Sequence, residues 1–202
     1  MPFNANTFRT QLSHGGARPN QFEITLMSPP ATFTDISNGG KVNDKFTYMA
    51  NSGELPASVI GTIPVPYFGR FINVAGDRMF EDWNCAVYCD EDFALRNAFE
   101  SWNNSMSFID YATNQEHGEN AKTIDLYVCD VKVAHYTKTG KIDKIYMLHN
   151  AFPYVVSPVQ LSWQENDQIM MFQVSWKYDY FTTNFNAYTG TGISDAEAGG
   201  TK

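Results

Sequence analysis

The chain has 202 residues, of which 43% are hydrophobic, 15% aromatic and 18% charged, and its formal net charge is −8. This composition excludes wholesale disorder, and the net acidity makes the chain as a whole a poor binder of nucleic acid or anionic lipid. No apolar stretch approaches the roughly 20 residues needed to cross a bilayer, and the length fits one domain with a sizeable core.

The first part of the chain predicts a short helix, one strand and a long loop. Residues 7–14 favour a helix that ends at the glycine pair 15–16, which would act as its C-cap. Residues 21–27, QFEITLM, predict a strand because Phe22, Ile24 and Leu26 alternate with polar neighbours. Residues 28–45 hold two prolines, two glycines and many polar residues, which predicts a loop.

Strands dominate the next segment. Residues 45–52, KFTYMANS, predict a second strand. Residues 58–75, SVIGTIPVPYFGRFINVA, are apolar, and their two prolines confine them to a sheet edge or a bent hairpin. Gly76-Asp77-Arg78 then predicts a turn, and residues 79–89, MFEDWNCAVYC, predict another strand.

The hydrophobic period then changes from two to about 3.6. Leu95, Phe99, Trp102 and Met106 recur at steps of four, three and four, the apolar stripe of an amphipathic helix, which we place at about 91–103. Asp90 or Asp92 is the candidate N-cap. The polar residues 104–123 predict a loop.

The last third predicts more strands and a tail. Residues 123–137 and 141–152 predict a hairpin with its turn at 138–141. Residues 168–181, QIMMFQVSWKYDYF, give the clearest strand. One of its faces carries Phe172, Val174, Trp176, Tyr178 and Tyr180. Residues 183–202 are small and polar and predict a flexible tail, which leaves a single domain over 1–182 with an amino-terminal arm over 1–20.

These elements predict a mainly β protein of the α+β type. We expect six to eight mostly antiparallel strands in two packed sheets, a barrel or sandwich, with one flanking helix. The 15 Phe and 11 Tyr favour the same class, because aromatic rings pack well on pleated sheets.

Residues that bind metals or catalyse reactions are sparse. Cys85, Cys89 and Cys129 cannot all pair, which favours reduced thiols and a cytoplasmic protein, as does the absence of a signal-peptide core in MPFNANTFRTQLSHGG. Cys85 and Cys89 lie on one predicted strand, where about 13 Å separates them, too far to share one zinc ion. Asp90-Glu91-Asp92 suits a divalent cation less well than a solvent-facing helix start.

No motif requires an enzyme. The histidines lie far apart in different elements; they are His14, His117, His135 and His149. A site shared by His135 and His149 is conceivable, but surface histidines are the commoner case. The sequence has no G-x-S-x-G, H-E-x-x-H or P-loop motif, and Gly190-Thr191-Gly192 has no helix-length segment after it. We expect neither catalysis, nor a cofactor, nor a metal.

Three stretches carry a family resemblance. Residues 54–102, ELPASVIGTIPVPYFGRFINVAGDRMFEDWNCAVYCDEDFALRNAFESW, combine a Leu-Pro-Ala step, an Ile-Pro-Val run, INVAGDR, an Asp-Trp pair and a helix ending near a Trp. ARPNQFEITL (17–26) and NAFPYVVSPVQLSWQENDQIMMFQVSWKYDYF (150–181) agree with the same pattern in the same order. Together they cover nearly half of the chain and resemble the tail tube protein family of T4-like contractile-tailed phages.

The resemblance implies a structural virion protein, assembled in the host bacterial cytoplasm. Members form hexameric rings whose strands join into an inner β-barrel, and the rings stack into the tube inside the contractile sheath. Implied partners are further copies, the sheath protein, the baseplate initiator, the tail terminator and the tape measure protein. Double-stranded DNA would pass through without specific binding, and acidity in the lumen would repel its phosphates.

The resemblance also suggests contact and lumen residues. We expect an inter-subunit or ring contact at Ile72, Asn73, Val74, Ala75, Gly76, Asp77 and Arg78. The alternatives for Gly76-Asp77-Arg78 are a turn of purely local importance with a surface ion pair, or an active-site corner. Residues 77–100 hold seven acids against Arg78 and Arg96, a local net charge of −5. The candidate lumen residues are Asp82, Asp125, Asp130 and Asp179.

Two other functions stay open on the sequence. The tube subunit of a type VI or extracellular contractile injection system would share the fold but carry protein. A small β-barrel that binds a ligand would have an enclosed apolar cavity. The segments 28–45 and 104–123 and the tail depart from the family pattern, so no contacts are carried over to them.

Overall fold

The computed structural model describes residues 4–12, 16–34, 42–106, 109–110, 115–116 and 124–184. The helices are α1 (Ala5–Gln11), α2 (Ala31–Thr34), α3 (Val42–Met49), α4 (Ala94–Met106) and a 3₁₀ helix at Ile124–Leu126. The strands are β1 (Phe22–Met27), β2 (Ala50–Gly53), β3 (Ser58–Tyr67), β4 (Arg70–Phe80), β5 (Trp83–Tyr88), β6 (Ile109–Asp110), β7 (Gln115–Glu116), β8 (Cys129–Tyr136), β9 (Ile142–Val156), β10 (Met171–Lys177) and β11 (Tyr180–Thr183).

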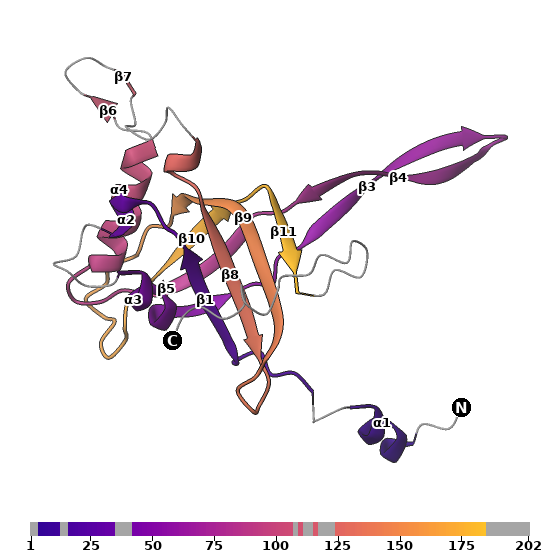
Figure 1. The fold of residues 1–202 in the computed structure, drawn as a ribbon, viewed down its shortest axis with the longest axis horizontal. Coiled ribbons are helices and arrows are strands. Elements are labelled where there is room, and N and C mark those ends of the chain that lie inside the picture. Colours follow the sequence, from indigo (N-terminus) through magenta and orange to yellow (C-terminus); the bar gives the residue numbers. More distant parts are fainter. Residues whose placement is uncertain are drawn as a thin grey trace.

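Two antiparallel sheets share the long strand β9 (Figure 1). The first part of β9 pairs with β8 and β11, and β8 pairs with β1; we call these four strands sheet A. The second part pairs with β10, which pairs with β5, which pairs with β2; we call these sheet B. The expected fold class, mainly β with two packed antiparallel sheets, is therefore confirmed.

The core is rich in aromatic rings. Phe172, Val174 and Trp176 of β10 are buried, as the alternation predicts. The Trp176 ring packs edge-on against Trp102 of α4 at a centroid distance of 5.6 Å and against Phe99 at 5.8 Å. Helix α4 thus packs on the sheets through the apolar stripe that the sequence predicts. The helix itself begins and ends about three residues later than predicted.

Two predictions for residues 28–52 are wrong. The expected loop over 28–45 contains α2 and the start of α3, and the strand expected over 45–52 is mostly the rest of α3. Val42 and Phe46 are both buried, one helical turn apart, so α3 places them together in the core. Only Ala50–Gly53 forms a strand.

The predicted cap of α4 is also wrong. The Asp90 side chain pairs with Lys45 of α3 instead of the helix end. Phe93, with φ +53°, immediately precedes the helix, and its carbonyl accepts from the Asn97 N–H at 2.8 Å. Asp90 therefore joins the connection between β5 and α4 to α3.

The single strand predicted over residues 168–181 is divided into two strands in the structure. β10 ends at Lys177 in sheet B and β11 begins at Tyr180 in sheet A. The Tyr180 ring stacks on His149 at a centroid distance of 4.6 Å and is about half exposed. Tyr180 is therefore not on the buried face of Phe172 and Trp176, contrary to the prediction.

The hairpin of β8 and β9 forms where the sequence predicts it. Gly140 has φ +78°, and the Thr137 N–H donates to the Lys141 carbonyl at 2.8 Å, which closes the β8–β9 turn. None of the helices in the described ranges is long and apolar enough to span a membrane. His14, His117, residues 185–202 and most of 104–123 lie outside the described residues, and the division into a domain (1–182) and a tail stays a prediction.

Candidate assembly surface

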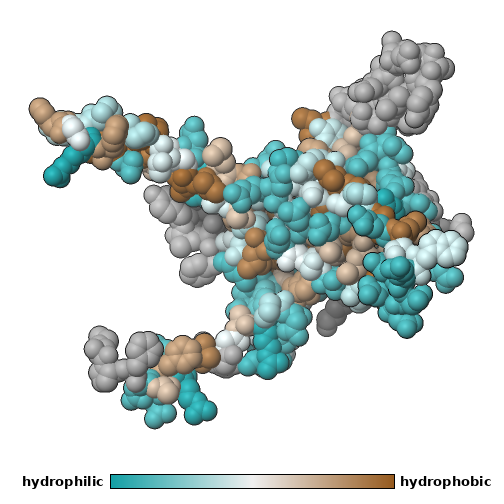
Figure 2. All heavy atoms as spheres, turned by 180° about the vertical axis from the view of Figure 1, so that it is seen from behind, coloured by the Kyte–Doolittle hydropathy of each residue, from teal (hydrophilic) through white to brown (hydrophobic). Residues whose placement is uncertain are grey.

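A hairpin of β3 and β4 projects from the body of the protein (Figure 1). Within the described residues these strands pair only with each other. Ten residues of strand span about 33 Å at about 3.3 Å per residue. Apolar side chains are exposed all along the arm; they are Val59, Ile60, Ile63, Val65, Tyr67, Phe68, Phe71, Ile72, Val74 and Met79. Figure 2 shows brown and tan spheres among white and teal ones on the arm. So large an exposed apolar surface marks an interaction site.

The two faces of the arm differ. Directly opposed residues share a face, so the pairs Ile63–Val74 and Val65–Ile72 form one aliphatic face. The opposite face carries the pairs Thr62–Ala75, Pro64–Asn73 and Pro66–Phe71. The aliphatic face lacks the threonine, asparagine and proline side chains of the other one, and it ends beside the turn in the pair Tyr67–Arg70. It is therefore the better contact surface.

The tip of the hairpin is a two-residue turn at Phe68 and Gly69. Their φ values are +44° and +77°, the signature of a type I′ turn. Gly69 suits this backbone, whereas Phe68 is strained there, and its side chain is 90% exposed. The Tyr67 ring meets the Phe68 ring edge-on at 4.6 Å. The hairpin thus presents two aromatic rings at its end.

Gly76-Asp77-Arg78 does not form a turn. These residues lie within β4, where the register shifts between Ile60 and Thr62, so the site is a β-bulge. A Cβ added at Gly76 would lie 3.2 Å from the Gly61 carbonyl oxygen, and this close approach is the reason for a glycine. The sequence pattern missed this because a bulge and a turn use the same residue types.

Asp77 and Arg78 are both exposed, and no ion pair between them is present in the described part of the chain. The surface ion pair considered above is therefore wrong. The whole range expected to make contacts, Ile72 to Arg78, lies on β4 of the projecting arm.

The base of the arm is fixed to the sheets on both legs. Phe80 packs against Phe181 at 5.5 Å and Tyr178 at 6.0 Å. On the other leg, the Trp83 indole N–H donates to the Glu54 carbonyl at 2.5 Å, and the Tyr178 hydroxyl donates to the Ala57 carbonyl at 3.4 Å. The arm is thus held in one direction relative to the body.

Asp82 adds a polar connection at the same base. Its carboxylate accepts from the Lys177 ammonium and from the Tyr154 hydroxyl, the latter at 2.5 Å. The hydrogen bond from Lys177, then that from Tyr154, lowers the pKa of Asp82. The same bond raises the pKa of Lys177. Asp82 therefore connects the end of β4 to β9 and β10.

The four lumen candidates are not brought together as a set. Asp82 lies at the arm base, and Asp125 lies in the 3₁₀ helix. Asp130 and Asp179 share a donor residue: the Asn150 N–H donates to Asp130 at 3.1 Å and the Asn150 side-chain amide donates to Asp179 at 2.7 Å.

The acids of residues 77–100 are likewise dispersed. Asp90 pairs with Lys45, and Glu100 pairs with Arg96 along α4.

The non-core face of sheet A is the charged one. Glu23 and Asp130 lie on it and are partly exposed, opposite in parity to the buried Ile24, Val131 and Val133. Lys132 shares this face but is only 6% exposed, and its neighbours Ala134 and Met147 are also buried. His149 belongs to the same face, where Nδ1 lies 3.3 Å from Asp130 Oδ2 and Nε2 lies 2.9 Å from Thr182 Oγ1. This cluster was not anticipated, because its members come from three strands.

His135 and His149 do not share a site. His135 Nε2 lies 2.9 Å from the Arg18 carbonyl oxygen, near the opposite end of β8. The cysteines are all free and buried. Burial raises the pKa of Cys85 to about 12, although the indole N–H of Trp176 donates to its sulfur at 3.3 Å.

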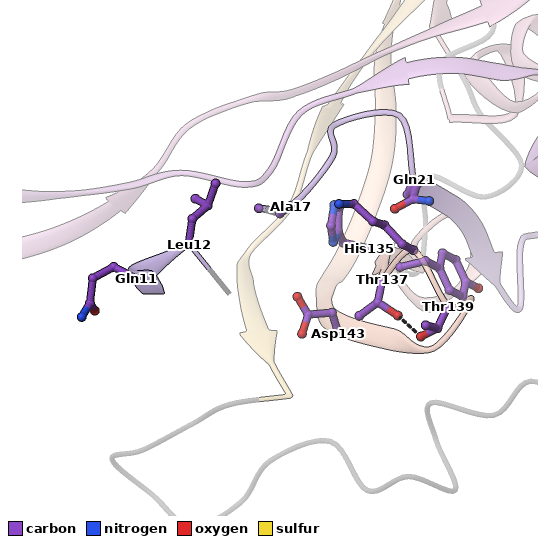
Figure 3. Close-up of a pocket in the computed structure, with 11 residues that line it drawn as sticks. Gln11, Leu12, Ala17, Gln21, His135, Thr137, Thr139 and Asp143 are labelled. Atoms are coloured by element: carbon purple, nitrogen blue, oxygen red, sulfur yellow. Dashed lines mark hydrogen bonds between the residues drawn. The ribbon is translucent and has the colours of Figure 1, made fainter. Parts of the chain in front are cut away.

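A pocket of about 620 Å³ lies between the segment that follows α1 and the β8–β9 turn (Figure 3). Its lining mixes apolar and polar residues, among them Leu12, Ala17, Gln21, Thr137 and Asp143, and it lies outside the space between the sheets. It is therefore not the enclosed apolar cavity between sheets that a ligand-binding barrel would have.

Comparison with solved structures shows the class to which this fold belongs. In the extended-state sheath/tube terminator of the PVC extracellular contractile injection system, one chain has a TM-score of 0.57 at 13% identity, covering 85% of this chain and 98% of that chain. A chain in the tube-terminating cap of the anti-feeding prophage has a TM-score of 0.55 at 16% identity, covering 83% and 89%. The fold is thus similar to that of chains found in contractile assemblies.

Sequence comparison identifies the family. The family model described as phage tail tube protein matches residues 17–184. The tail tube protein gp19 of Enterobacteria phage T4 is 31% identical over 166 residues, which cover 82% of this chain and 90% of that protein. The tail tube protein of Serratia phage KSP90 is 22% identical over 175 residues, covering 86% and 93%. The chain belongs to the phage tail tube protein family and is a structural component of contractile phage tails.

Proposed function

We propose that this protein closes into hexameric rings and that the β3–β4 arm joins each ring to the next in the inner tail tube. The observation that carries this proposal is the arm itself, an exposed apolar hairpin held rigidly at its base by Phe80, Asp82 and Trp83. A contiguous exposed apolar surface of this kind marks a site of interaction with a partner.

The edges of sheet A support closure of the ring. Within the described residues β1 pairs only with β8, and β11 pairs only with β9, so these strands form the two opposite edges. Asn43 Nδ2 donates to the Leu26 carbonyl at 2.9 Å and thereby covers one end of the β1 edge. The rest of β1 meets β11 of the next copy, and a closed ring leaves neither edge exposed to uncontrolled pairing.

The non-core face of sheet A then lines the lumen. Its partly exposed charges are Glu23 and Asp130, with Asp179 joined to Asp130 through Asn150, whereas Lys132 on the same face is buried. Repetition around the ring and along the tube makes this a predominantly negative wall. Screening limits the reach of that wall to about 8 Å at physiological salt, which keeps duplex DNA off the surface without holding it.

The tube conducts the genome, and its role is mechanical and not catalytic. Its partners are the sheath outside, the initiator and terminator at the two ends, and the tape measure protein within. The alternative, a tube for protein cargo, shares this fold. The 31% identity to a phage tail tube protein favours the phage tail.

Negative-stain electron microscopy of the purified protein, at rising concentration and with a baseplate initiator, tests the assembly. We expect six-fold rings or hollow tubes. A species that stays monomeric under both conditions would overturn the proposal.

A further inference from the structure

A second exposed apolar surface lies in the loop between β9 and β10, residues 157–170. Trp163 is 102% exposed, and Leu161 and Ile169 are also largely exposed. Both ends of the loop are fixed, because the Ser157 N–H donates to the Gln173 carbonyl and the Cys89 N–H donates to the Met170 carbonyl, each at 2.8 Å. We call this surface the Trp163 loop. Neither the fold nor the ring edges account for it.

The Trp163 loop and the arm lie at opposite ends of sheet B. In the β5–β10 register, Trp83 opposes Trp176 at the end where the arm joins, and Tyr88 opposes Met171 at the other end. The loop leads directly into Met171. Six strand residues, about 17–20 Å, therefore separate the two surfaces along the sheet. A head-to-tail contact between identical subunits uses two different patches, and opposite ends suit that geometry.

The charges of the two surfaces are complementary. The distal part of the arm, residues 62–75, carries a single charged residue, Arg70, next to the turn. The Trp163 loop carries Glu165 and Asp167 and no basic residue, and both acids are exposed.

The amino-terminal helix α1 is a weaker candidate for the same contact. It presents Phe8 and Leu12, but its one charged residue is Arg9, which would repel Arg70. Helix α1 and the Trp163 loop both present apolar side chains, so apolar character does not decide which of them contacts the arm. The charge does, because only the Trp163 loop carries acids opposite in sign to Arg70.

We propose that the arm tip of one subunit docks on the Trp163 loop of a subunit in the neighbouring ring. Tyr67 and Phe68 pack against Trp163 and Leu161, and Arg70 lies between Glu165 and Asp167. This contact fixes which subunits of successive rings meet, because aromatic anchors and a charge pair must coincide. The inference rests on the proposed stacking of rings and adds the identity of the acceptor surface.

Cysteine cross-linking tests the contact. Phe68→Cys and Trp163→Cys proteins are mixed, assembled and treated with a short thiol-specific cross-linker; Cys85, Cys89 and Cys129 are buried and should not react. We expect a covalent dimer from this mixture. The matched control is Tyr48→Cys, an exposed aromatic position on α3 outside the loop, which should give no dimer with Phe68→Cys. Tubes that form without the Phe68–Trp163 cross-link would overturn the inference and leave ring stacking intact.

Charge reversal gives an independent test if a cysteine variant fails to assemble. Arg70→Glu should raise the critical concentration for assembly by at least about tenfold, because the introduced carboxylate would be repelled by Glu165 and Asp167 of the neighbouring subunit. Adding Glu165→Arg and Asp167→Arg to the same chain should restore assembly to within about threefold of wild type. An Arg70→Glu protein that assembles normally, or a triple variant that assembles no better than Arg70→Glu, would overturn the contact. If the wild-type protein forms no polymer, the proposed function itself fails.

Discussion

Asn150 and Asp179 are hydrogen-bonded to each other at the corner between the two sheets. At this corner β9 passes from sheet A into sheet B, and the chain passes from β10 in sheet B to β11 in sheet A. Asn150 lies in β9 with φ +55°, and its Nδ2 donates at 2.7 Å to Oδ2 of Asp179, which lies between β10 and β11. The Asn150 N–H also donates to Asp130 Oδ1 at 3.1 Å. This corner sets the direction of sheet B, and therefore of the arm, relative to sheet A.

Substitution of Asn150 should weaken the corner. Asn150→Ala loses the bond to Asp179 and places an alanine at a positive φ, so we expect the free energy of unfolding to fall by about 2–3 kcal/mol. Asn150→Gly loses the same bond but tolerates the backbone, so it should cost about 1 kcal/mol less than the alanine variant. Urea unfolding followed by circular dichroism measures both. Equal stability of wild type and Asn150→Ala would show that the corner is not a constraint.

The two faces of the arm should respond differently to a charge. Ile72→Asp places a carboxylate on the aliphatic face, and we expect the critical concentration for assembly to rise at least about tenfold. Asn73→Asp, the neighbouring residue on the other face, is the matched control and should change it by less than about threefold. Sedimentation measures assembly, and thermal unfolding should show both monomers within about 2 °C of wild type, because neither side chain is in the core. Equal defects in the two variants would mean that the faces are equivalent.

The bulge should tolerate a methyl group on one strand better than on the other. A Cβ at Gly76 would lie 3.2 Å from the Gly61 carbonyl oxygen, whereas a Cβ at Gly61 would have its nearest contact at 3.4 Å, with the Asp77 carbonyl oxygen. Gly76→Ala should therefore change the bend of the arm and reduce assembly more than Gly61→Ala, while both monomers stay folded. Quantitative sedimentation of the two variants side by side decides this. A stronger defect in Gly61→Ala would contradict the geometry.

Asp82 should contribute to stability above the pH range in which it titrates. Its pKa is lowered in the folded protein, so its contribution is complete above the unfolded value of about 3.9 and is lost as the pH falls through the lower folded value. Because the side chain is one-third exposed, Asp82→Asn should lower the melting temperature by only about 1–3 °C at pH 6. That difference should vanish well below pH 4. A difference that grows on acidification would reverse the sign of this argument.

The sequence predicted elements whose periodicity was clear. Alternation identified β1 and β10, and the stripe from Leu95 to Met106 identified α4, because one buried face imposes its own period. Residues 45–49 fit either a strand or a helix, because five residues of mixed polarity do not define a period. Only the tertiary contact of Phe46 with the core decides for a helix there.

The contacts expected for residues 72–78 stay a prediction, and only their place in the fold is known. The contact range from Ile72 to Arg78 lies on the arm, but the prediction of a turn at Gly76 missed the bulge, since local sequence does not show which strand is opposite. The break between Lys177 and Tyr180 was missed for a related reason. It depends on Asn150, which lies 29 residues earlier in the chain.

A cryo-electron microscopy map of the assembled polymer tests the central claim most directly. We predict stacked six-fold rings in which each β3–β4 arm is buried against a subunit of the next ring, and in which β1 and β11 of neighbouring subunits are adjacent in a ring with a predominantly acidic lumen. A polymer whose arms extend into solvent, or whose lumen is lined mainly by basic side chains, would contradict this account.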